Sequence, residues 1–336
     1  MVCKPDITVI MPVFNGDKFV RNAIESILNQ THSDFKFMII DDGSTDETPN
    51  ILAEYARKDS RITVICQENA GITESLNRLV RIADGDFIAR MDADDVSMPK
   101  RFERQVAKLI ANPDYLAVGC WVRELFENNA LNHEIIYPDK PDLLNRHLRK
   151  GINCYAHGSV MMRRAVFEEL GLLYRFEEGE DFDLWLRLIE RGRLGIVEEV
   201  LYQRYNHAHS FSSERIFRTH SNRNLMVRLA RERAKYGREL SDWKEEEKRL
   251  HKKFPLLDDN EKKRYANYFE ARMLLCAGKT IEARRLLSTV KGDLGNVRNV
   301  RIAILLSYLP GFLIGFILRW RDKIKGKLYY RRKISV

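Results

Sequence analysis

Two pairs of closely spaced aspartates are the first groups in this sequence that could do chemistry. Asp92 and Asp94 are separated by a single alanine, and Asp41 and Asp42 are adjacent. Carboxylate oxygens are hard ligands that suit Mg²⁺ or Mn²⁺, and such ions bridge to substrate phosphates. A carboxylate at the end of a strand can also accept a hydrogen bond from a ribose hydroxyl or a base N–H. Each pair by itself is equally typical of a solvated turn that caps a helix.

A third acidic cluster, Glu180 and Asp181, stands at the start of an amphipathic segment. Leu184, Leu188 and Ile189 give that segment an apolar helical face. The helix dipole favours an ionised carboxylate at this end, so the cluster could supply a general base that takes a proton from an attacking hydroxyl. Simple helix capping is the alternative for this cluster taken alone.

The first third of the chain alternates between apolar runs and helical periodicity. Strands are predicted at Ile7–Val13, Phe35–Ile40, Arg61–Cys66 and Asp86–Met91, and helices at Asp17–Asn29, 47–57, Ile72–Ile82 and Pro99–Ile110. Ser44 and Glu47 have the spacing of a capping box that would open the second helix. The alternation predicts a doubly wound α/β sheet.

Polar residues follow each predicted strand at its carboxyl end. The four sets are Asn15-Gly16, then residues 41–44, 68–71 and 92–95. In doubly wound sheets, ligands bind beyond the carboxyl ends of the strands. We therefore expect one crevice to collect all four sets.

After about residue 215 the sequence changes to long charged helices. They are predicted at Glu214–Arg238 and Asp242–Lys253, and a helical hairpin of tetratricopeptide type follows at Tyr265–Val290. A single hairpin cannot bury both of its faces, so it must pack on the rest of the chain. The expected parts are an α/β domain at 1–213, a helical region at 214–298 and a tail at 299–336.

The tail combines an apolar run with a basic flank. Ile302–Leu318 has no charged residue but contains Pro310-Gly311, and the last 36 residues hold nine Lys and Arg against one Asp. At about 1.5 Å per residue, a straight helix of this length would barely cross a bilayer. A broken hairpin or an in-plane segment on an anionic membrane surface is favoured. A true span and a buried helix are the alternatives.

Composition narrows the class of protein. Of 336 residues, 44% are hydrophobic and 31% charged, which suits a folded protein with a sizeable core. The five cysteines are scattered without a C-x-x-C pair, which fits a reducing compartment. The net charge of +9 is concentrated toward the tail and forms no recognisable nucleic-acid-binding module. We expect no nucleic acid partner, and a cytoplasmic location on the inner face of the cell membrane.

Together and in this order, the clusters resemble those of family 2 glycosyltransferases with the GT-A fold. The matching stretches are TVIMPVFNGDKFVRNAIESILNQT, MIIDDGSTDETPNIL, ENAGITESLNRLVRIADGDFIARMDADDVSMPKRFERQV, HGSVMMRR and GEDFDLWLRL. They lie within residues 6–210. The resemblance implies a Rossmann-like mixed sheet, here followed by a helical C-terminal region.

The resemblance also implies an inverting transfer of a sugar from a nucleotide donor, usually a UDP-sugar, with Mn²⁺ or Mg²⁺. Asp94 matches the metal ligand of the DXD motif, and Asp92 lies nearer the ribose or phosphate and shares the metal site. Asp181 matches the catalytic base, with Glu180 as its neighbour. The other nucleotide-binding positions fall on Pro12, Val13, Asn15, Asp41, Asp42, Asn69 and Gly71.

Some positions depart from the family pattern. Many relatives carry Ala-Arg-Asn where this chain has Leu76-Asn77-Arg78, so Arg78 or Arg90 is assigned to the phosphates. His207 aligns best as a phosphate- or metal-facing histidine, with His209 as an alternative and a plain loop histidine as the other interpretation.

The acceptor side is expected to include His157, Trp185 and Arg187, although a tryptophan at helical spacing is as often core. The loops Tyr137–Asp142 and Asn153–His157 carry no readable signal for the sugar or the acceptor.

The expected function is a membrane-associated glycosyltransferase that acts on a lipid-linked or growing glycan in surface polysaccharide biosynthesis. An inactive relative that holds a nucleotide-sugar as a scaffold or sensor is the alternative, which the presence of Asp94 and Asp181 disfavours. A nucleotidyltransferase is disfavoured because the first strand leads into Pro12-Val13-Phe14-Asn15-Gly16 and not into a glycine-rich loop. The long helices allow a homo-oligomer.

Overall fold

The computed structural model describes residues 6–126, 132–169, 171, 173–206, 216–253, 260, 264, 267, 268, 271, 274, 275, 279–290, 308 and 331–335. Contacts divide the chain into two compact units. The first comprises residues 1–122, 137–204 and 219–253, and the second comprises 123–136, 205–218 and 254–336.

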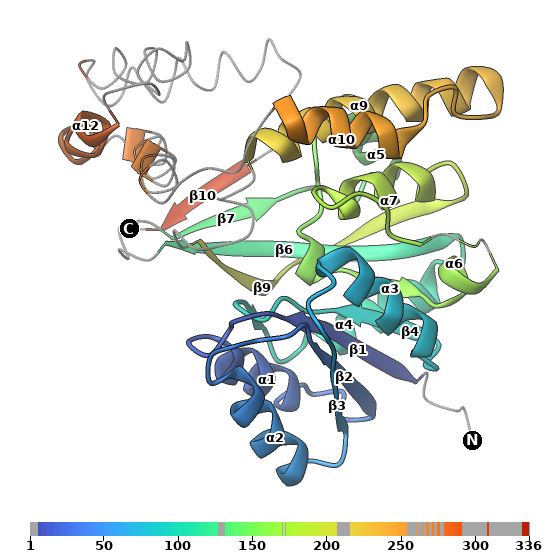
Figure 1. Ribbon diagram of the computed structural model, residues 1–336, viewed down its shortest axis with the longest axis vertical. Helices are drawn as coiled ribbons and strands as arrows, with labels where there is room; N and C mark the ends of the chain where they lie inside the picture. The colour runs from blue at the N-terminus through green and yellow to red at the C-terminus, as the bar shows by residue number, and fades with distance from the viewer. Residues whose placement is uncertain are drawn as a thin grey trace. The chain divides into compact units, whose positions relative to one another are not determined.

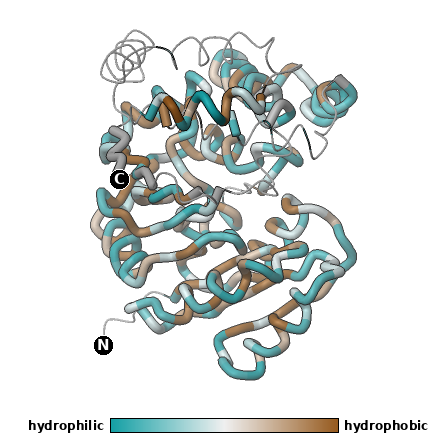
Figure 2. Tube along the Cα trace, turned by 90° about the vertical axis from the view of Figure 1, so that its left-hand side faces the viewer, coloured by the Kyte–Doolittle hydropathy of each residue, from teal (hydrophilic) through white to brown (hydrophobic). Residues whose placement is uncertain are grey.

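Four parallel strands form the centre of the first unit. They are β1 (Ile7–Val13), β2 (Phe35–Asp41), β3 (Ile62–Cys66) and β4 (Phe87–Arg90). β1 lies between β2 and β4, and all seven of its residues are buried. A strand that is covered on both faces needs such a continuous apolar run. Each of these four predicted strands is confirmed to within one residue at either end. Figure 2 shows hydrophobic stretches alternating with hydrophilic ones along the chain.

The connecting helices follow the doubly wound pattern. They are α1 (Val20–Leu28), α2 (Thr48–Lys58), α3 (Ile72–Ile82) and, after β4, α4 (Arg101–Ala111). Figure 1 shows α1 and α2 on one side of β1–β3 and α3 on the other. α3 packs on β1 and β2.

The predicted capping box at the start of α2 is wrong. The helix begins at Thr48, whose backbone N–H donates to Oδ1 of Asp46 (2.9 Å). The hydroxyl of Ser44 instead accepts a hydrogen bond from the backbone N–H of Asn15 (2.9 Å). Ser44 therefore ties two loops together, a contact that local spacing does not reveal.

Antiparallel strands extend the sheet beyond β4. The order in this unit is β6-β8-β4-β1-β2-β3, with β6 at Tyr115–Phe126 and β8 at Met161–Arg163. The short β5 (Val96–Ser97) pairs with β9 (Arg193–Asn206), which also pairs with β6. The sheet is therefore mixed, as the fold prediction required. The remaining elements here are α5 (Pro141–Arg149), a 3-10 turn (His157–Ser159), α6 (Ala165–Glu168) and α7 (Glu180–Leu188).

Two long helices complete the first unit. α9 (Ile216–Tyr236) and α10 (Trp243–Lys253) confirm the predicted charged helices. They pack on the segment before α7, where Asn222 Nδ2 donates to the carbonyl of Glu178 (3.1 Å) and the N–H of Glu177 donates to Glu247 (2.9 Å). The compact unit thus runs past residue 213, the expected end of the α/β domain.

The second unit is described only in part. Its β7 (Asn132–Ile136) pairs antiparallel with β10 (Arg331–Ser335), a strand that the sequence did not predict. α12 (Thr280–Thr289) lies within the second half of the predicted hairpin, and most of the first half lies outside the described residues. So does the apolar run Ile302–Leu318, apart from Tyr308. Within the described part of the chain, no helix has the length and apolarity needed to cross a membrane.

Candidate active site

The carboxyl ends of β1 and β2 are joined by hydrogen bonds. The carbonyl of Val13 accepts from the N–H of Asp42 (2.9 Å). Asn15, with a left-handed φ of 49°, accepts from the N–H of Thr45 through its Oδ1 (2.8 Å). The structure thus brings together the first two of the four predicted sets. Asn15 is nevertheless exposed to solvent.

Asp41 and Asp42 are both buried and shape the loops around them. Asp41 Oδ1 accepts from the N–H of Ser44 (3.0 Å). Asp42 accepts from the side chain of Gln67 (2.6 Å) and from the N–H groups of Ala70 and Gly71 (both 2.9 Å). Asp42 therefore holds residues 67–71, the loop that the resemblance places over the nucleotide base.

The loop at residues 67–71, which follows the third strand, packs closely against the loop at residues 41–44, which follows the second strand. Gly43 has a φ of 79°, and a Cβ there would lie 2.8 Å from the backbone nitrogen of Asn69. Gly71 has a φ of 85° just before α3. Both positions favour glycine, because L side chains rarely adopt this conformation. Asn69 itself is exposed.

The two candidate phosphate-facing arginines occupy different environments. Arg78 is exposed on α3, and its Nη1 donates to Gln67 Oε1 (2.8 Å), so it lies beside the third loop. Arg90 is only 1% exposed, and its Nη2 donates to Asp92 Oδ1 (2.7 Å). Arg90 therefore supports Asp92 from within, and Arg78 is the one of the two that is accessible to a diphosphate.

Arg90 is a buried cation with unused hydrogen-bonding capacity. Its Nε and Nη1 have no hydrogen-bond partner among the residues that the structure describes. Burial disfavours its charge, but Asp92, Tyr174 and Tyr202 together raise the pKa of Arg90 above the ordinary value. The guanidinium thus stays charged and fixes one oxygen of Asp92.

The DXD carboxylates lie at the fourth strand end. Asp92 and Asp94 are both partly exposed, and the carboxylate of Asp92 is 29% exposed. A pair of accessible carboxylates is a donor set that suits Mn²⁺ or Mg²⁺. The expected third ligand, His207, and its alternative His209 lie outside the described residues.

The motif His157-Gly158-Ser159 connects the DXD carboxylates to the predicted base. A Cβ added to Gly158 would overlap with the carboxylate of Asp92 and the hydroxyl of Tyr202. One residue earlier, His157 Nδ1 lies 3.2 Å from Glu180 Oε1. Asp92 and the start of α7 are therefore parts of one site.

Asp181 occupies the first turn of α7. The helix follows Gly179, whose φ is 84° and whose missing Cβ leaves room for Met226. Asp181 Oδ2 accepts from Asn153 Nδ2 (2.9 Å), and Oδ1 accepts from the N–H of Phe182 (2.6 Å). Burial, and then the negative charge of Glu180, raise the pKa of Asp181. A partly exposed carboxylate with a raised pKa suits a general base.

Glu180 is held by an aromatic and imidazole cluster. Its partner His157 also lies 3.1 Å from the hydroxyl of Tyr174 through Nε2. Tyr174 in turn exchanges two hydrogen bonds with Asn77 on α3 (2.9 and 3.0 Å). The contact chain thus runs from α3, beside the third loop, to the acidic pair at α7.

Two predicted acceptor-side residues are buried. Trp185 is 0% exposed and packs its ring near those of His157 and Tyr155. Arg187 donates to Asp183 Oδ2 (2.8 Å) and to the carbonyl of Leu173 (2.6 Å). Both are residues of α7 whose side chains are buried, and this burial disfavours the direct contact with an acceptor that was expected of them. Of the predicted acceptor-side set, His157 alone lies beside Glu180.

Some residues of the site were missed by the sequence analysis. Phe14 is 51% exposed at the end of β1, which its place after an apolar run could have suggested. Asn153 and Tyr202 act through contacts over long sequence separations, at Asp181 and at the N–H of Asp92 (3.3 Å). No local signal marks either of them.

Comparisons with known proteins identify the family. A family model described as glycosyl transferase family 2 matches residues 8–171. The putative glycosyltransferase EpsE of Bacillus subtilis (strain 168) is 36% identical over 205 residues, which are 59% of this chain and 72% of that protein. The O-antigen biosynthesis glycosyltransferase WbnJ of Escherichia coli is 37% identical over 185 residues, 54% of this chain and 71% of that protein.

Solved structures show the same fold. TarS of S. aureus, residues 1–349, in complex with UDP superimposes with a TM-score of 0.52 at 15% identity, covering 95% of this chain and 92% of that one. The mannosyltransferase PcManGT of Pyrobaculum calidifontis, in complex with GDP-Man and Mn²⁺, gives a TM-score of 0.52 at 18% identity, covering 96% and 89%. The chain belongs to glycosyltransferase family 2 and is a glycosyltransferase with a GT-A-like fold.

Proposed function

We propose that this glycosyltransferase moves a sugar from a nucleotide-sugar, a UDP-sugar in the first instance, to a hydroxyl of a lipid-linked or growing glycan in surface polysaccharide assembly. The observation that carries the proposal is the contact chain from Asp92 through Gly158 and His157 to Glu180. This chain of contacts supports the proposal because it would connect the proposed nucleotide- and metal-binding edge to the acidic pair that includes the proposed base, Asp181.

The donor side would use the four loop sets at the strand ends. Phe14 is exposed enough to stack on a base, and Asn15 and Asn69 are also exposed. Asp42 positions the third loop, and Arg78 is the accessible cation for the diphosphate. TarS was solved with UDP and PcManGT with GDP-Man, so both bases are to be tested, with uracil favoured by the family resemblance.

Asp92 and Asp94 would hold Mn²⁺ or Mg²⁺. The ion would act as a Lewis acid that neutralises the charge growing on the departing diphosphate. Arg90 fixes one oxygen of Asp92, whose side chain is still 29% exposed. PcManGT was solved with Mn²⁺, which supports this choice of ion.

The transfer itself would be a single displacement. Asp181 takes the proton from the acceptor hydroxyl, whose oxygen forms the new bond to the anomeric carbon as the bond to the diphosphate breaks. One displacement inverts the anomeric centre, and it needs no nucleophile from the protein. Asn153 orients the carboxylate of Asp181, and Glu180 with His157 borders the acceptor side.

The acceptor class rests on relatives and on the sequence. WbnJ is named for O-antigen biosynthesis, a process that builds surface polysaccharide. The apolar run Ile302–Leu318 and the basic residues after it favour work at an anionic membrane surface. A cytoplasmic enzyme held peripherally at the membrane is the corresponding location.

Binding of donors and nucleoside diphosphates tests the donor half of this proposal. Calorimetry with UDP, GDP and dTDP and their sugars, with and without Mn²⁺, should give one preferred nucleotide whose affinity depends on the metal. Phe14→Ala should weaken that binding, whereas Ile110→Ala, which alters a residue exposed to 57%, should not. Absence of binding by every nucleotide would contradict the proposal.

A further inference from the structure

The turn between α9 and α10 presents apolar and cationic side chains together. Tyr236 and Leu240 are 51% and 56% exposed. Arg231, Lys235 and Arg238 are also exposed, and Lys235 Nζ lies 4.8 Å from the ring centroid of Tyr236. Single exposed apolar side chains are ordinary on a protein surface. Two large ones within five residues, among three cations, form a distinct surface, which we call the α9–α10 tip (residues 231–240).

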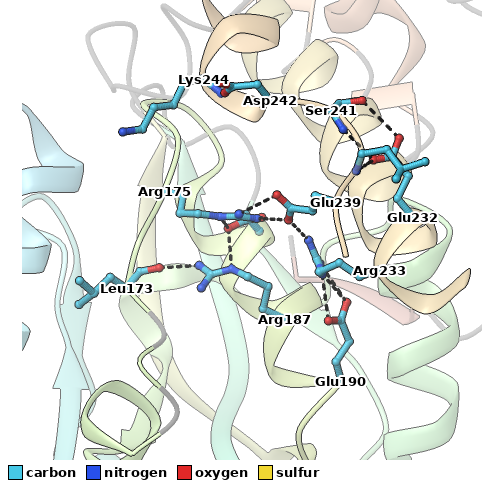
Figure 3. A network of polar contacts seen from close by, with 12 residues as sticks. Leu173, Arg175, Arg187, Glu190, Glu232, Arg233, Glu239, Ser241, Asp242 and Lys244 are labelled. Atoms are coloured by element: carbon cyan, nitrogen blue, oxygen red, sulfur yellow. Dashed lines mark hydrogen bonds and ion pairs between the residues drawn. The ribbon is translucent and has the colours of Figure 1, made fainter. Parts of the chain in front are cut away.

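Contacts from the inside of the turn hold the tip in shape. Glu239 accepts from Arg175 through both carboxylate oxygens (3.1 and 2.9 Å) and also binds Arg233 (Figure 3). Glu232 accepts from the N–H groups of Leu240 (2.8 Å) and Ser241 (3.3 Å). Gly237, with a φ of 70°, allows the chain to reverse.

Within residues 231–240 this network leaves cations as the outward-facing charges. The next carboxylate along the turn, Asp242, is exposed and accepts a hydrogen bond from the backbone N–H of Lys244 (2.9 Å) at the start of α10. Both carboxylates of the tip, Glu232 and Glu239, form hydrogen bonds or ion pairs within the protein, and their side chains are only 15% and 18% exposed. Arg233 is likewise turned inward, to Glu190 and Glu239. Arg231, Lys235 and Arg238 therefore face solvent without a carboxylate from the tip beside them. Each such cation strengthens attraction to an anionic lipid surface by about five-fold.

The apolar side chains suit the same partner. A tyrosine and a leucine flanked by long basic side chains can enter the headgroup region while the charged groups stay at its surface. A nucleic acid would also attract the cations, but it offers no apolar phase for Leu240. The surface as a whole fits an anionic bilayer.

The same helix, α9, connects the tip to the segment that carries the acidic pair of α7. α9 runs from the tip back to Met226 and Arg223, and Met226 packs against Gly179 just before the acidic pair of α7. Arg223 lies over the ring of Phe182 (5.2 Å), the residue after Asp181. At about 1.5 Å per residue, the helix separates Arg223 from Tyr236 by about 20 Å.

We propose that the α9–α10 tip docks on anionic membrane lipids, with Tyr236 and Leu240 entering the headgroup region and Arg231, Lys235 and Arg238 contacting lipid phosphates. This docking is separate from any contact made by the tail. It does not depend on which sugar or acceptor the enzyme uses.

Hydrogen exchange on the full chain tests the docking at the tip itself. Vesicles of phosphatidylglycerol with phosphatidylcholine should slow amide exchange at residues 235–241, and vesicles of phosphatidylcholine alone should not. Binding to the charged vesicles without protection of this segment would overturn the proposal, and so would equal protection by both kinds of vesicle.

Matched variants give a second, quantitative test by vesicle flotation. The double change Tyr236→Ser with Leu240→Ser, and the double change Lys235→Glu with Arg238→Glu, should each lower partition to the charged vesicles at least about five-fold. Ile110→Ser and Lys58→Glu with Lys100→Glu are controls for exposed apolar and basic residues elsewhere. Calorimetry with UDP and Mn²⁺ measures whether each variant still binds the nucleotide, and this binding should be unchanged. Partition lowered equally by the control variants would contradict docking through the tip.

Discussion

Gly158 leaves the space that the carboxylate of Asp92 occupies, because a Cβ at this position would overlap with that carboxylate and with the hydroxyl of Tyr202. The same 3-10 turn carries His157, whose Nδ1 lies 3.2 Å from Glu180. A turn of three residues thus sets the distance between the DXD motif and α7.

Replacing Gly158 tests this spacing. Gly158→Ala should displace Asp92 and lower metal-dependent nucleotide affinity by about ten-fold or more, equivalent to about 1.4 kcal/mol. Gly192→Ala is the matched control, since its Cβ would lie 2.7 Å from the side chain of Leu116. Calorimetry with UDP and Mn²⁺ measures both variants. Equal affinities in the two variants would show that Asp92 does not depend on Gly158.

Asp94 should be the carboxylate on which metal dependence rests. Asp94→Asn keeps the shape of the side chain but removes the charge that a hard divalent cation prefers. We expect Mn²⁺ to stop strengthening nucleotide binding in this variant. Asp114→Asn, which alters an exposed aspartate paired with Arg193, should behave as the unmodified chain. Full metal dependence in Asp94→Asn would remove Asp94 from the metal site.

The charge of Glu180 should set the acidic limit of activity. Burial and Glu180 raise the pKa of Asp181, and a general base works only when ionised. The rate should therefore fall as pH drops through this raised pKa. Glu180→Gln removes the repelling charge, lowers the pKa of Asp181, and should move the acidic limb to lower pH. Profiles of turnover between about pH 4 and 8 measure this.

Glu177→Gln is the control for that profile, because its carboxylate is 68% exposed and close in sequence. Its acidic limb should stay in place. If the acidic limb of the turnover profile is unchanged in Glu180→Gln, or moves to higher pH, Asp181 is not the base that titrates.

The ion network around Asp183 of α7 should contribute strongly to stability. Asp183 is 0% exposed and binds Arg175 (2.7 and 3.0 Å) and Arg187 (2.8 Å). Burial opposes its ionisation, but the two arginines hold the pKa of Asp183 below its ordinary value. Asp183→Asn leaves the buried Arg187 without its carboxylate partner and leaves Arg175 with Glu239 alone, and it should cost about 3–5 kcal/mol. Urea denaturation measures the loss.

The pH dependence of that stability has a definite sign. Because the folded-state pKa of Asp183 is lowered, its contribution is present above about pH 4 and is lost as pH falls further. Asp183→Asn should flatten this part of the stability profile. Asp59→Asn, in a more exposed pair with Arg61, should cost under about 1 kcal/mol. Equal losses in the two variants would contradict a special role for the network.

The parallel half of the sheet could be predicted from sequence because its signals are local. Ile7–Val13 is a continuous apolar run, and strands of this kind place the polar residues that follow them at one edge. This reasoning led to the hypothesis for the DXD pair, whereas the hypothesis for Asp181 came from its place at a helix start and from the family resemblance. The paired strands β6, β8 and β9 depend on register between distant segments, which periodicity does not encode.

Roles that depend on tertiary contacts could not be predicted. Ser44 has the spacing of a helix cap, yet its hydroxyl binds the loop of Asn15. Arg90 lies next to the DXD motif, as a phosphate ligand would, yet it is enclosed behind Asp92. Trp185 follows the acidic pair as closely as an acceptor-binding residue would, and it is core. A hydrogen bond between distant loops decides the case of Ser44, and burial decides the cases of Arg90 and Trp185. Both are properties of the whole fold.

Donor turnover tests the central claim most directly. Purified protein with Mn²⁺ and a panel of UDP-, GDP- and dTDP-sugars should release nucleoside diphosphate from one donor, with a membrane extract supplying acceptors. The release should be lost without metal and should fall by about 100-fold or more in Asp181→Asn, while that variant still binds the donor. Metal-dependent donor binding with equal turnover in Asp181→Asn would contradict the assignment of Asp181. Binding without any turnover in the unmodified chain would favour a nucleotide-sugar-binding scaffold.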